Sequence, residues 1–257
     1  MKYPAILQRS IRAPLMCAAE TLARVSARML PNQCALCGNL SHPTICAHCD
    51  AAYWNEARLR CAQCALPLPA GRSRRTGGYR CGACRDAPPP FDATLALADY
   101  RAPLDGLALD LKFRARLALG PEFAARLARL ADDRLGAAHG LDLIAPVPLA
   151  RRRLAERGYN QAWAIARPLA RRLRVRAAAT LAERVADTAP QSRLDAGARR
   201  ANVAAAFALT RPVAGLHVGL VDDVMTSGAT LDALAHKLKE AGARRVTNFV
   251  ALRTPQD

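Results

Sequence analysis

Residues 218–230 read as a β-strand, a short polar loop and the start of a helix, and this stretch constrains the fold more than any other. The aliphatic strand ends at two adjacent acids, Asp222 and Asp223, and Gly228 precedes leucines at helical spacing. A loop that leads into a helix directs backbone N–H groups at an anion, and glycine allows a close approach. Because carboxylates hydrogen-bond well to vicinal hydroxyls, we expect a sugar phosphate held at both ends.

The same stretch resembles the phosphoribosyl-pyrophosphate (PRPP) motif of type I phosphoribosyltransferases. In that motif aliphatic residues and two acids precede a Thr/Ser-Thr/Ser-Gly-x-Thr turn, and here only Met225 and Ser227 vary. The resemblance implies that the loop binds the 5′-phosphate of PRPP while Asp222 and Asp223 orient the ribose. A helix cap with ordinary turn residues is the alternative interpretation. The implied phosphate loop comprises Val224, Met225, Thr226, Ser227, Gly228, Ala229 and Thr230.

Eight of the nine cysteines fall in four Cys-x-x-Cys pairs, which is the spacing of metal ligands. The surrounding segment, residues 31–87, lacks long apolar runs, so bound metal must contribute to its folding. We predict two zinc sites that are structural rather than catalytic, because four thiols per ion leave no open coordination position. A redox role for one pair is the weaker alternative. The predicted ligands are Cys34, Cys37, Cys46, Cys49, Cys61, Cys64, Cys81 and Cys84.

The pairing of these cysteines has two solutions. Sequential sets place the first two pairs on one ion and the last two pairs on the other, and they close shorter loops at lower entropic cost. Cross-braced sets join the first pair with the third and the second with the fourth, and this pairing is retained as the alternative. Thiolate ligands need a reducing compartment, so we expect the protein in the cytoplasm.

Two further features indicate the domain organisation. Residues 1–30 carry apolar residues at close to helical spacing with basic residues between them. This pattern predicts an amphipathic helix, packed on its own protein or on a membrane surface or partner. The stiff stretch Ala87-Pro88-Pro89-Pro90 marks a boundary. We therefore expect an N-terminal helix over 1–30, a double zinc ribbon over 31–87 and a larger domain over 91–257, with no stretch long enough for a membrane span.

The formal net charge of +17 favours polyanionic partners, whether PRPP, nucleotides or DNA, in a salt-dependent way. Arginine and alanine are abundant, and such a bias can also reflect genome base composition. Only 5% of the residues are aromatic, which weakens a case for DNA binding by base stacking. The charge therefore indicates the sign of a partner rather than its identity.

Alternating strand and helix patterns from residue 93 to residue 252 predict an α/β domain with a parallel sheet and flanking helices. In such sheets ligands lie beyond the carboxyl ends of the strands. The run Arg157-Gly158-Tyr159-Asn160-Gln161 follows a predicted strand at 141–147, so we expect it at the same edge as the two acids. A polar stretch over 188–202, which includes Gln191 and Arg199, is expected to form a movable lid or a plain surface loop.

Together these motifs resemble the ComF/ComFC family, bacterial competence-associated proteins with a double zinc ribbon ahead of a phosphoribosyltransferase-like domain. The family often has phenylalanine where Tyr159 stands and glutamate where Ala198 stands, so no role for that acid carries over. The resemblance covers nearly the whole chain after about residue 30. The motifs that occur in the family's order are the cysteine pairs, Lys112-Phe113, Pro146-Val147-Pro148-Leu149, Arg157 to Gln161, Gln191, Arg199, Asn202-Val203, Ala206-Phe207 and Asp222-Asp223.

The resemblance implies the type I phosphoribosyltransferase fold and two competing functions. In the first, Mg²⁺ binds with PRPP and a nucleophile displaces pyrophosphate from C1 of the ribose. Asp222, Asp223, Arg157 and Lys112 would then be the catalytic residues, and the acceptor is not named. In the second, the protein binds single-stranded DNA without catalysis through its zinc ribbons and arginine-rich surface, together with other competence proteins. The residues implied for a lid or for pyrophosphate are Tyr159, Asn160, Gln161, Gln191 and Arg199.

Overall fold

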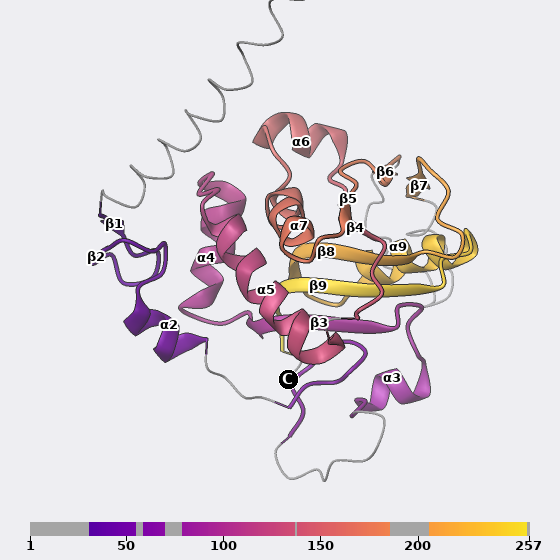
Figure 1. The fold of residues 1–257 in the computed structure, drawn as a ribbon, viewed down its shortest axis with the longest axis horizontal. Coiled ribbons are helices and arrows are strands. Elements are labelled where there is room, and N and C mark those ends of the chain that lie inside the picture. The colour runs from indigo at the N-terminus through magenta and orange to yellow at the C-terminus, as the bar shows by residue number, and fades with distance from the viewer. Residues whose placement is uncertain (1–30, 55–58, 70–78, 137, 186–205, 256–257) are drawn as a thin grey trace, which may run out of the picture. The chain divides into compact units, whose positions relative to one another are not determined.

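A computed structural model of the chain describes residues 31–54, 59–69, 79–136, 138–185 and 206–255 (Figure 1). The predictions for the helix at 1–30 and for the lid residues Gln191 and Arg199 lie outside these ranges. The chain divides into two compact units, Met1–Tyr53 and Trp54–Asp257. The expected division at 1–30, 31–87 and 91–257 stays a prediction.

The described part of the first unit is small and contains the first two cysteine pairs. Strand β1 (Asn32–Gln33) pairs antiparallel with β2 (Leu40–Ser41), and helix α2 (Ala47–Tyr53) follows. Gly38 adopts a φ of 75° in the turn between the strands, a conformation that favours glycine. The buried hydrophobic residues here are Cys34, Ile45 and Cys49. Because thiols form most of this small core, its stability depends on the group that the thiols bind.

The second unit is built on a five-stranded parallel sheet with the order β3-β9-β8-β4-β5. This confirms the predicted α/β class. Two short strands, β6 (Ala182–Arg184) and β7 (Phe207–Leu209), form a separate antiparallel pair. The sheet strands are β3 (Ala93–Asp99), β4 (Leu143–Pro146), β5 (Arg176–Ala177), β8 (His217–Met225) and β9 (Arg245–Arg253).

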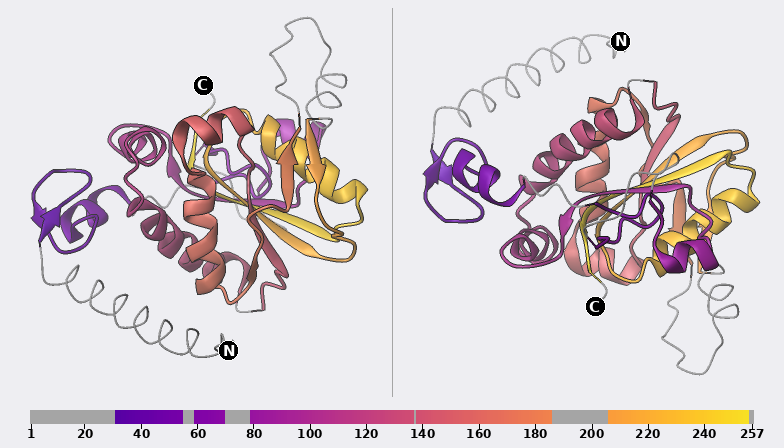
Figure 2. Two further views of the ribbon diagram at one scale, coloured as in Figure 1. Left: turned by 90° about the horizontal axis from the view of Figure 1, so that it is seen from above. Right: turned by 90° about the horizontal axis from the view of Figure 1, so that it is seen from below.

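Helices cover both faces of the sheet (Figure 2). Helices α5 and α7 pack so closely that a Cβ at Gly120 would lie 2.4 Å from the backbone oxygen of Ala164. Helix α9 lies on the opposite face from α5 and α7. The bounds are α4 (Leu104–Phe113), α5 (Leu119–Leu135), α6 (Arg151–Arg157), α7 (Gln161–Arg172) and α9 (Ala229–Glu240).

The last two cysteine pairs belong to the hydrophobic core of the second unit. Cys61, Cys64 and Cys84 are buried in one cluster with Leu231 and Leu234 of α9. A short helix, α3 (Gly82–Asp86), carries the last of these cysteines. The second cysteine set therefore stabilises the sheet unit directly, because its ligand residues contribute to the same apolar core.

Strand β8 is longer than the sequence pattern predicts. It continues through both acids to Met225, because β9 pairs with it along its whole length, from His217 opposite Arg245 to Met225 opposite Arg253. The acids therefore lie within the carboxyl end of the ladder between β8 and β9 rather than after it, and the strand backbone fixes their positions. Within the described ranges, no helix is both long enough and apolar enough to cross a membrane.

Candidate functional site

The loop between β8 and α9 is a tight turn built around glycine. Gly228 has a φ of 86°, a conformation that favours glycine, and a Cβ there would lie 2.5 Å from the Met225 Cε atom and displace the end of that side chain. The Ser227 hydroxyl accepts a hydrogen bond from the Ala229 N–H at 3.3 Å. Thr226, Ser227 and Ala229 are exposed. The positive end of a 12-residue helix thus faces solvent beside an open loop, as an anion site requires.

The two acids differ in their surroundings. Asp223 is 4% exposed, whereas Asp222 is half-buried. Burial and then the neighbouring Asp223 carboxylate raise the pKa of Asp222, while Lys112 acts in the opposite direction. The Asp222 Oδ1 atom accepts the Asp223 backbone N–H at 2.9 Å. Among the described residues, the buried Asp223 Oδ2 atom has no hydrogen-bond partner, so this oxygen is available to a donor on a ligand.

A single side chain connects the acids to the predicted cationic residues. Gln161, at the start of α7, is 5% exposed and donates from Nε2 to the Asp223 Oδ1 atom at 3.4 Å. Its Oε1 atom accepts a hydrogen bond from the Arg157 guanidinium. An amide that uses its donor and its acceptor in this way has its orientation fixed. The geometry thereby holds Arg157 near the carboxyl half of β8.

Arg157 and Lys112 converge on one aromatic ring. The Arg157 guanidinium lies 5.5 Å from the centroid of the Phe113 ring, and the Lys112 ammonium lies 5.4 Å from it. Phe113 is 68% exposed. These residues line a pocket of about 590 Å³ together with Arg153, Glu156 and Tyr159. Three cations and one carboxylate line this pocket, and the excess of positive charge favours a polyanionic group there.

The structure gives Tyr159 and Asn160 positions that hold the loop together. The Tyr159 hydroxyl donates to the Leu111 carbonyl at 2.6 Å, which ties the loop to the end of α4. The Asn160 Oδ1 atom caps α7 by accepting the Ala162 N–H at 2.8 Å, and its Nδ2 atom donates to the Val147 carbonyl at 3.0 Å. These contacts place Gln161 at the acids.

The predicted site residues within the described ranges thus fall into one connected group. Gln161 donates a hydrogen bond to Asp223 and accepts one from Arg157. Lys112 is close enough to oppose the rise in the pKa of Asp222. The loop residues Val224 to Thr230 follow the acids directly along β8 and into α9. The remaining residues, Gln191 and Arg199, lie outside the described ranges.

The eight cysteines form two compact sets. Within each set, all four sulfur atoms lie within 4.8 Å of one another. The sets are Cys34/Cys37/Cys46/Cys49 and Cys61/Cys64/Cys81/Cys84, so the structure selects sequential over cross-braced pairing.

The distances within these sets suit a tetrahedral metal ion. The sulfur atoms of Cys37 and Cys46 are 3.9 Å apart, and those of Cys64 and Cys81 are 3.6 Å apart. Ligands at about 2.3 Å from a tetrahedral zinc ion lie roughly 3.8 Å from one another. Backbone N–H groups also point at the sulfurs: Cys46 N–H donates to Cys34, and Cys81 N–H donates to Cys61, each at 3.3 Å. Both sets can therefore hold a metal ion.

Hydrogen bonding favours the charged form of one thiol in the second set. The Cys64 side chain and then backbone N–H groups lower the pKa of Cys61 to about 4, although burial opposes them. Interaction with Cys61, followed by burial, raises the pKa of Cys64. Without a counter-charge the four thiols cannot all ionise together, and a divalent cation would supply that charge.

Comparison with known proteins identifies relatives over most of the chain. The DNA utilization protein YhgH of Salmonella typhi is 38% identical over 234 residues, which cover 88% of this chain and 98% of the relative. YhgH of Escherichia coli K12 is 36% identical with the same coverage. Competence protein F of Haemophilus influenzae is 30% identical over 78% of this chain and 93% of its own.

The chain belongs to the ComF/YhgH family. A scan against protein-family models finds no match. Relatives of ComF/YhgH type at this identity and coverage establish the membership without one.

Among solved structures, phosphoribosyltransferases match the ComF/YhgH chain at low identity. A purine phosphoribosyltransferase from Pyrococcus horikoshii shares 17% identity with a TM-score of 0.32, over 52% of this chain and 83% of that one. A hypoxanthine phosphoribosyltransferase from Staphylococcus aureus shares 11% identity with a TM-score of 0.36, over 53% and 76%. At these TM-scores the likeness supports no conclusion about the site, and the parallel sheet is observed directly.

Arg253 is a contributor to the site of this ComF/YhgH protein that the sequence motifs do not reveal. It is the last residue of β9 and only 1% exposed. Its guanidinium donates to the backbone carbonyls of Cys64, Met225, Thr226 and Thr254. The signal in the sequence is a charged residue directly after the apolar run of residues 249–252, because a charge buried there needs a partner.

Proposed function

We propose that this ComF/YhgH protein binds PRPP with Mg²⁺ and transfers its 5-phosphoribosyl group, in a role connected with DNA uptake. The observation that carries the proposal is the buried Asp223 carboxylate at the end of β8. It has one oxygen without a partner among the described residues and the other linked through Gln161 to Arg157. The loop between β8 and α9 begins three residues later, at Thr226. Hydroxyl, phosphate and pyrophosphate groups of PRPP would each find a complementary neighbour.

The binding roles follow from the chemistry of the side chains. Asp222 and Asp223 would accept hydrogen bonds from the ribose hydroxyls. The backbone of residues 226–230 and the start of α9 would hold the 5′-phosphate. Lys112 and Arg157 would face the pyrophosphate, whose charge suits an ammonium and a guanidinium.

The proposed reaction exchanges one bond at C1 of the ribose for another. The bond from C1 to the pyrophosphate oxygen breaks and its electron pair leaves with pyrophosphate, while an acceptor nucleophile forms the new bond at C1. Positive charge develops on the ribose, and Asp222 and Asp223 would stabilise it. Lys112 and Arg157 would neutralise the leaving group. When bound with PRPP, Mg²⁺ would offset the negative charge that develops on the leaving pyrophosphate.

We further propose zinc as the metal in both cysteine sets, since four-thiolate tetrahedral sites are typical of structural zinc. Closed sets of four sulfurs leave no position for a substrate. Thiolate ligands also require a reducing environment, which favours the cytoplasm.

Binding of single-stranded DNA is the second candidate function, and one groove favours it. The exposed face of α7 presents Trp163, Arg167 and Arg171 at helical spacing along a groove of about 670 Å³. An aromatic ring beside a line of guanidinium groups suits a base and successive phosphates. Relatives are named for DNA utilization and competence, so DNA and other competence proteins are the partners we propose.

Release of pyrophosphate from PRPP tests the enzymatic proposal. Purified protein would be supplied with Mg²⁺, PRPP and a panel of nitrogen and oxygen nucleophiles, and pyrophosphate would be measured. Turnover with one acceptor, lost in Asp223→Asn, is the expected result. If the protein binds PRPP but gives no turnover with any acceptor, it acts as a PRPP-binding module, and the proposed transfer of the phosphoribosyl group is contradicted.

Fluorescence titration of an oligodeoxythymidylate tests the second candidate. Arg167→Gln with Arg171→Gln should weaken binding and reduce the salt slope by roughly 1.4, since each phosphate contact on a single strand contributes about 0.7. The control is Arg172→Gln, on the same helix but outside the groove. Equal affinity in all three proteins would exclude the α7 groove.

A further inference from the structure

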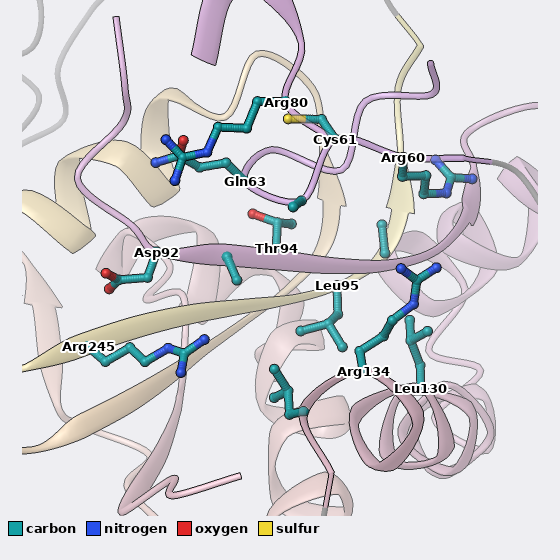
Figure 3. Close-up of a pocket in the computed structure, with 14 residues that line it drawn as sticks. Arg60, Cys61, Gln63, Arg80, Asp92, Thr94, Leu95, Leu130, Arg134 and Arg245 are labelled. Carbon is teal, nitrogen blue, oxygen red and sulfur yellow. The ribbon is translucent and has the colours of Figure 1, made fainter. Parts of the chain in front are cut away.

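A second arginine-lined pocket lies at the other end of the sheet from the acids (Figure 3). It has a volume of about 320 Å³ and lies between residues 60–63, the first half of β3, the end of α5 and the start of β9. Arg245 pairs with His217 at the amino ends of β9 and β8. Asp222 lies five residues further along β8, roughly 16 Å away at the rise of a strand. The pocket is thus separate from the proposed PRPP site.

Four guanidinium groups from four segments surround this pocket. Figure 3 shows Arg60 and Arg80 on one side of β3 and Arg134 and Arg245 on the other. Arg60 pairs with Asp99 at 2.8 Å. Within the described ranges, the other three make no ion pair, and all three are exposed. Three unpaired cations around one hollow repel one another, and a bound anion would relieve that repulsion.

The one carboxylate that lines the pocket already has two partners other than the arginines. Asp92 accepts the Val246 N–H at 2.7 Å and pairs with Lys239 at 2.8 Å. Within the described ranges, Asp92 makes no ion pair with any of the four arginines. The local charge at the pocket stays positive.

Two buried polar atoms distinguish the pocket from an ordinary solvated arginine cluster. Gln63 is 5% exposed and donates from Nε2 to the carbonyls of Pro89 and Phe91, at 3.2 and 3.1 Å. Its buried Oε1 atom has no partner among the described residues, and neither has the buried Nη2 atom of Arg60. An unmet acceptor and an unmet donor at one pocket are costly to leave unpaired. A ligand with an anionic oxygen and an O–H or N–H group would pair with both.

We propose that this pocket binds a small phosphorylated metabolite, of the nucleoside monophosphate or sugar phosphate class, at a site independent of the acid pair. The phosphate lies beside Arg134, whose planar guanidinium group matches phosphate oxygens, while Arg80 and Arg245, which Figure 3 shows at other places on the rim, add to the positive potential. A hydroxyl or amino group of the same ligand donates to Gln63. The volume is at the small end of ligand pockets, which favours a single nucleotide or sugar over a polymer.

Hydrogen exchange with adenosine 5′-monophosphate as the probe tests the proposal on the full chain. The probe should slow exchange in residues 59–66 and 92–96, and neutral adenosine should not. Arg134→Gln with Arg245→Gln should weaken this binding about tenfold or more, as expected for the loss of one charge-assisted contact and of a second positive charge on the rim. Both side chains are exposed, so the variant should fold. Arg129→Gln, exposed on the same helix but outside the pocket, should bind as the parent protein does.

Three results would overturn the proposal. Slower exchange only at residues 224–230 would assign the phosphate of the probe to the loop after β8. Equal binding of the probe by the double variant and by Arg129→Gln would show that the two arginines do not hold it. Slower exchange at 59–66 and 92–96 with an oligodeoxythymidylate, but not with the monophosphate, would assign the arginines to a nucleic-acid backbone instead.

Discussion

The guanidinium of Arg253 donates a hydrogen bond from Nε to the backbone carbonyl of Cys64, at 3.0 Å. Its Nη1 atom donates to the carbonyls of Met225, at 3.0 Å, and of Thr226. One buried side chain thus connects the second cysteine set to the first residues of the phosphate-type loop. The metal site and the loop share a rigid link, so a change at one should alter the other.

Replacement of Arg253 by leucine should therefore destabilise the second unit. The substitution removes the Arg253 donor from the Cys64, Thr226 and Thr254 carbonyls, whereas the Met225 carbonyl keeps the Thr254 N–H, and the expected loss in the free energy of unfolding is about 3 kcal/mol. Chemical denaturation followed by tryptophan fluorescence measures it. Hydrogen exchange should speed up both at residues 61–66 and at 224–228, and Arg172→Leu on the surface of α7 should change neither. Faster exchange at only one of the two segments would contradict the proposed link.

Asp222→Asn should stabilise the free protein at neutral pH. Because burial and Asp223 raise the pKa of Asp222, the folded chain binds a proton there that the unfolded chain has lost, so ionisation costs stability as the pH rises. Asparagine removes that cost, and its Oδ1 atom can still accept the Asp223 N–H. The melting temperature of the variant should exceed that of the parent protein at pH 7 and approach it in acid. A variant that is less stable at pH 7 would show that the charge is favourable in the fold.

His217 should make the fold sensitive to mild acid. Burial, and then the charges of Arg245 and Arg244, lower the pKa of this histidine to about 4 from its usual 6.5. Its ring contacts the Thr247 hydroxyl at 2.8 Å, and Asp142 accepts its backbone N–H at 2.8 Å. The unfolded chain takes up a proton first, so stability is complete above pH 6.5 and falls as the pH drops towards 4, by up to about 3 kcal/mol.

The control for this prediction is His217→Asn, which cannot titrate. Its free energy of unfolding should change less between pH 6.5 and pH 4.5 than that of the parent protein. Parallel pH profiles for the two proteins would show that His217 is not the group responsible.

The two cysteine sets should contribute to stability in different places. Both tryptophans, Trp54 and Trp163, lie in the second unit, so their fluorescence follows that unit alone. Cys61→Ser with Cys64→Ser should lower its melting temperature strongly, because these residues belong to its core. The matched variant Cys34→Ser with Cys37→Ser should leave it nearly unchanged. Elemental analysis should find about two zinc ions per parent chain and about one in each variant.

Local patterns predicted much of this molecule. The Cys-x-x-Cys pairs gave the ligand sets, since metal spacing is a local property, although only the structure chose between sequential and cross-braced pairing. The alternation of strands and helices predicted the parallel sheet, and the rule for strand ends correctly brought Gln161 to Asp223. Contacts between distant segments were not predictable in the same way. Arg253 reaches Cys64 across 189 positions, and no periodicity encodes such a pair.

The structure also refines what individual residues do. Asn160 matched a motif implied to bind pyrophosphate, yet its side chain caps α7 and holds the Val147 carbonyl. A motif match predicts which residue types occur, but it does not predict which hydrogen bonds their side chains form. Strand β8 exceeded its expected length because pairing with β9, which the local pattern of β8 does not contain, extends it.

The most direct test of the account is calorimetric titration of Mg²⁺-PRPP into the parent protein and into Asp222→Asn with Asp223→Asn. The near-isosteric amides should preserve the fold, as the melting temperature without ligand will report. Asp133→Asn, exposed on α5, is the matched control. We predict saturable binding at one site in the parent protein and in Asp133→Asn, and none in the double variant. Equal affinity for Mg²⁺-PRPP in all three proteins would contradict the assignment of this site.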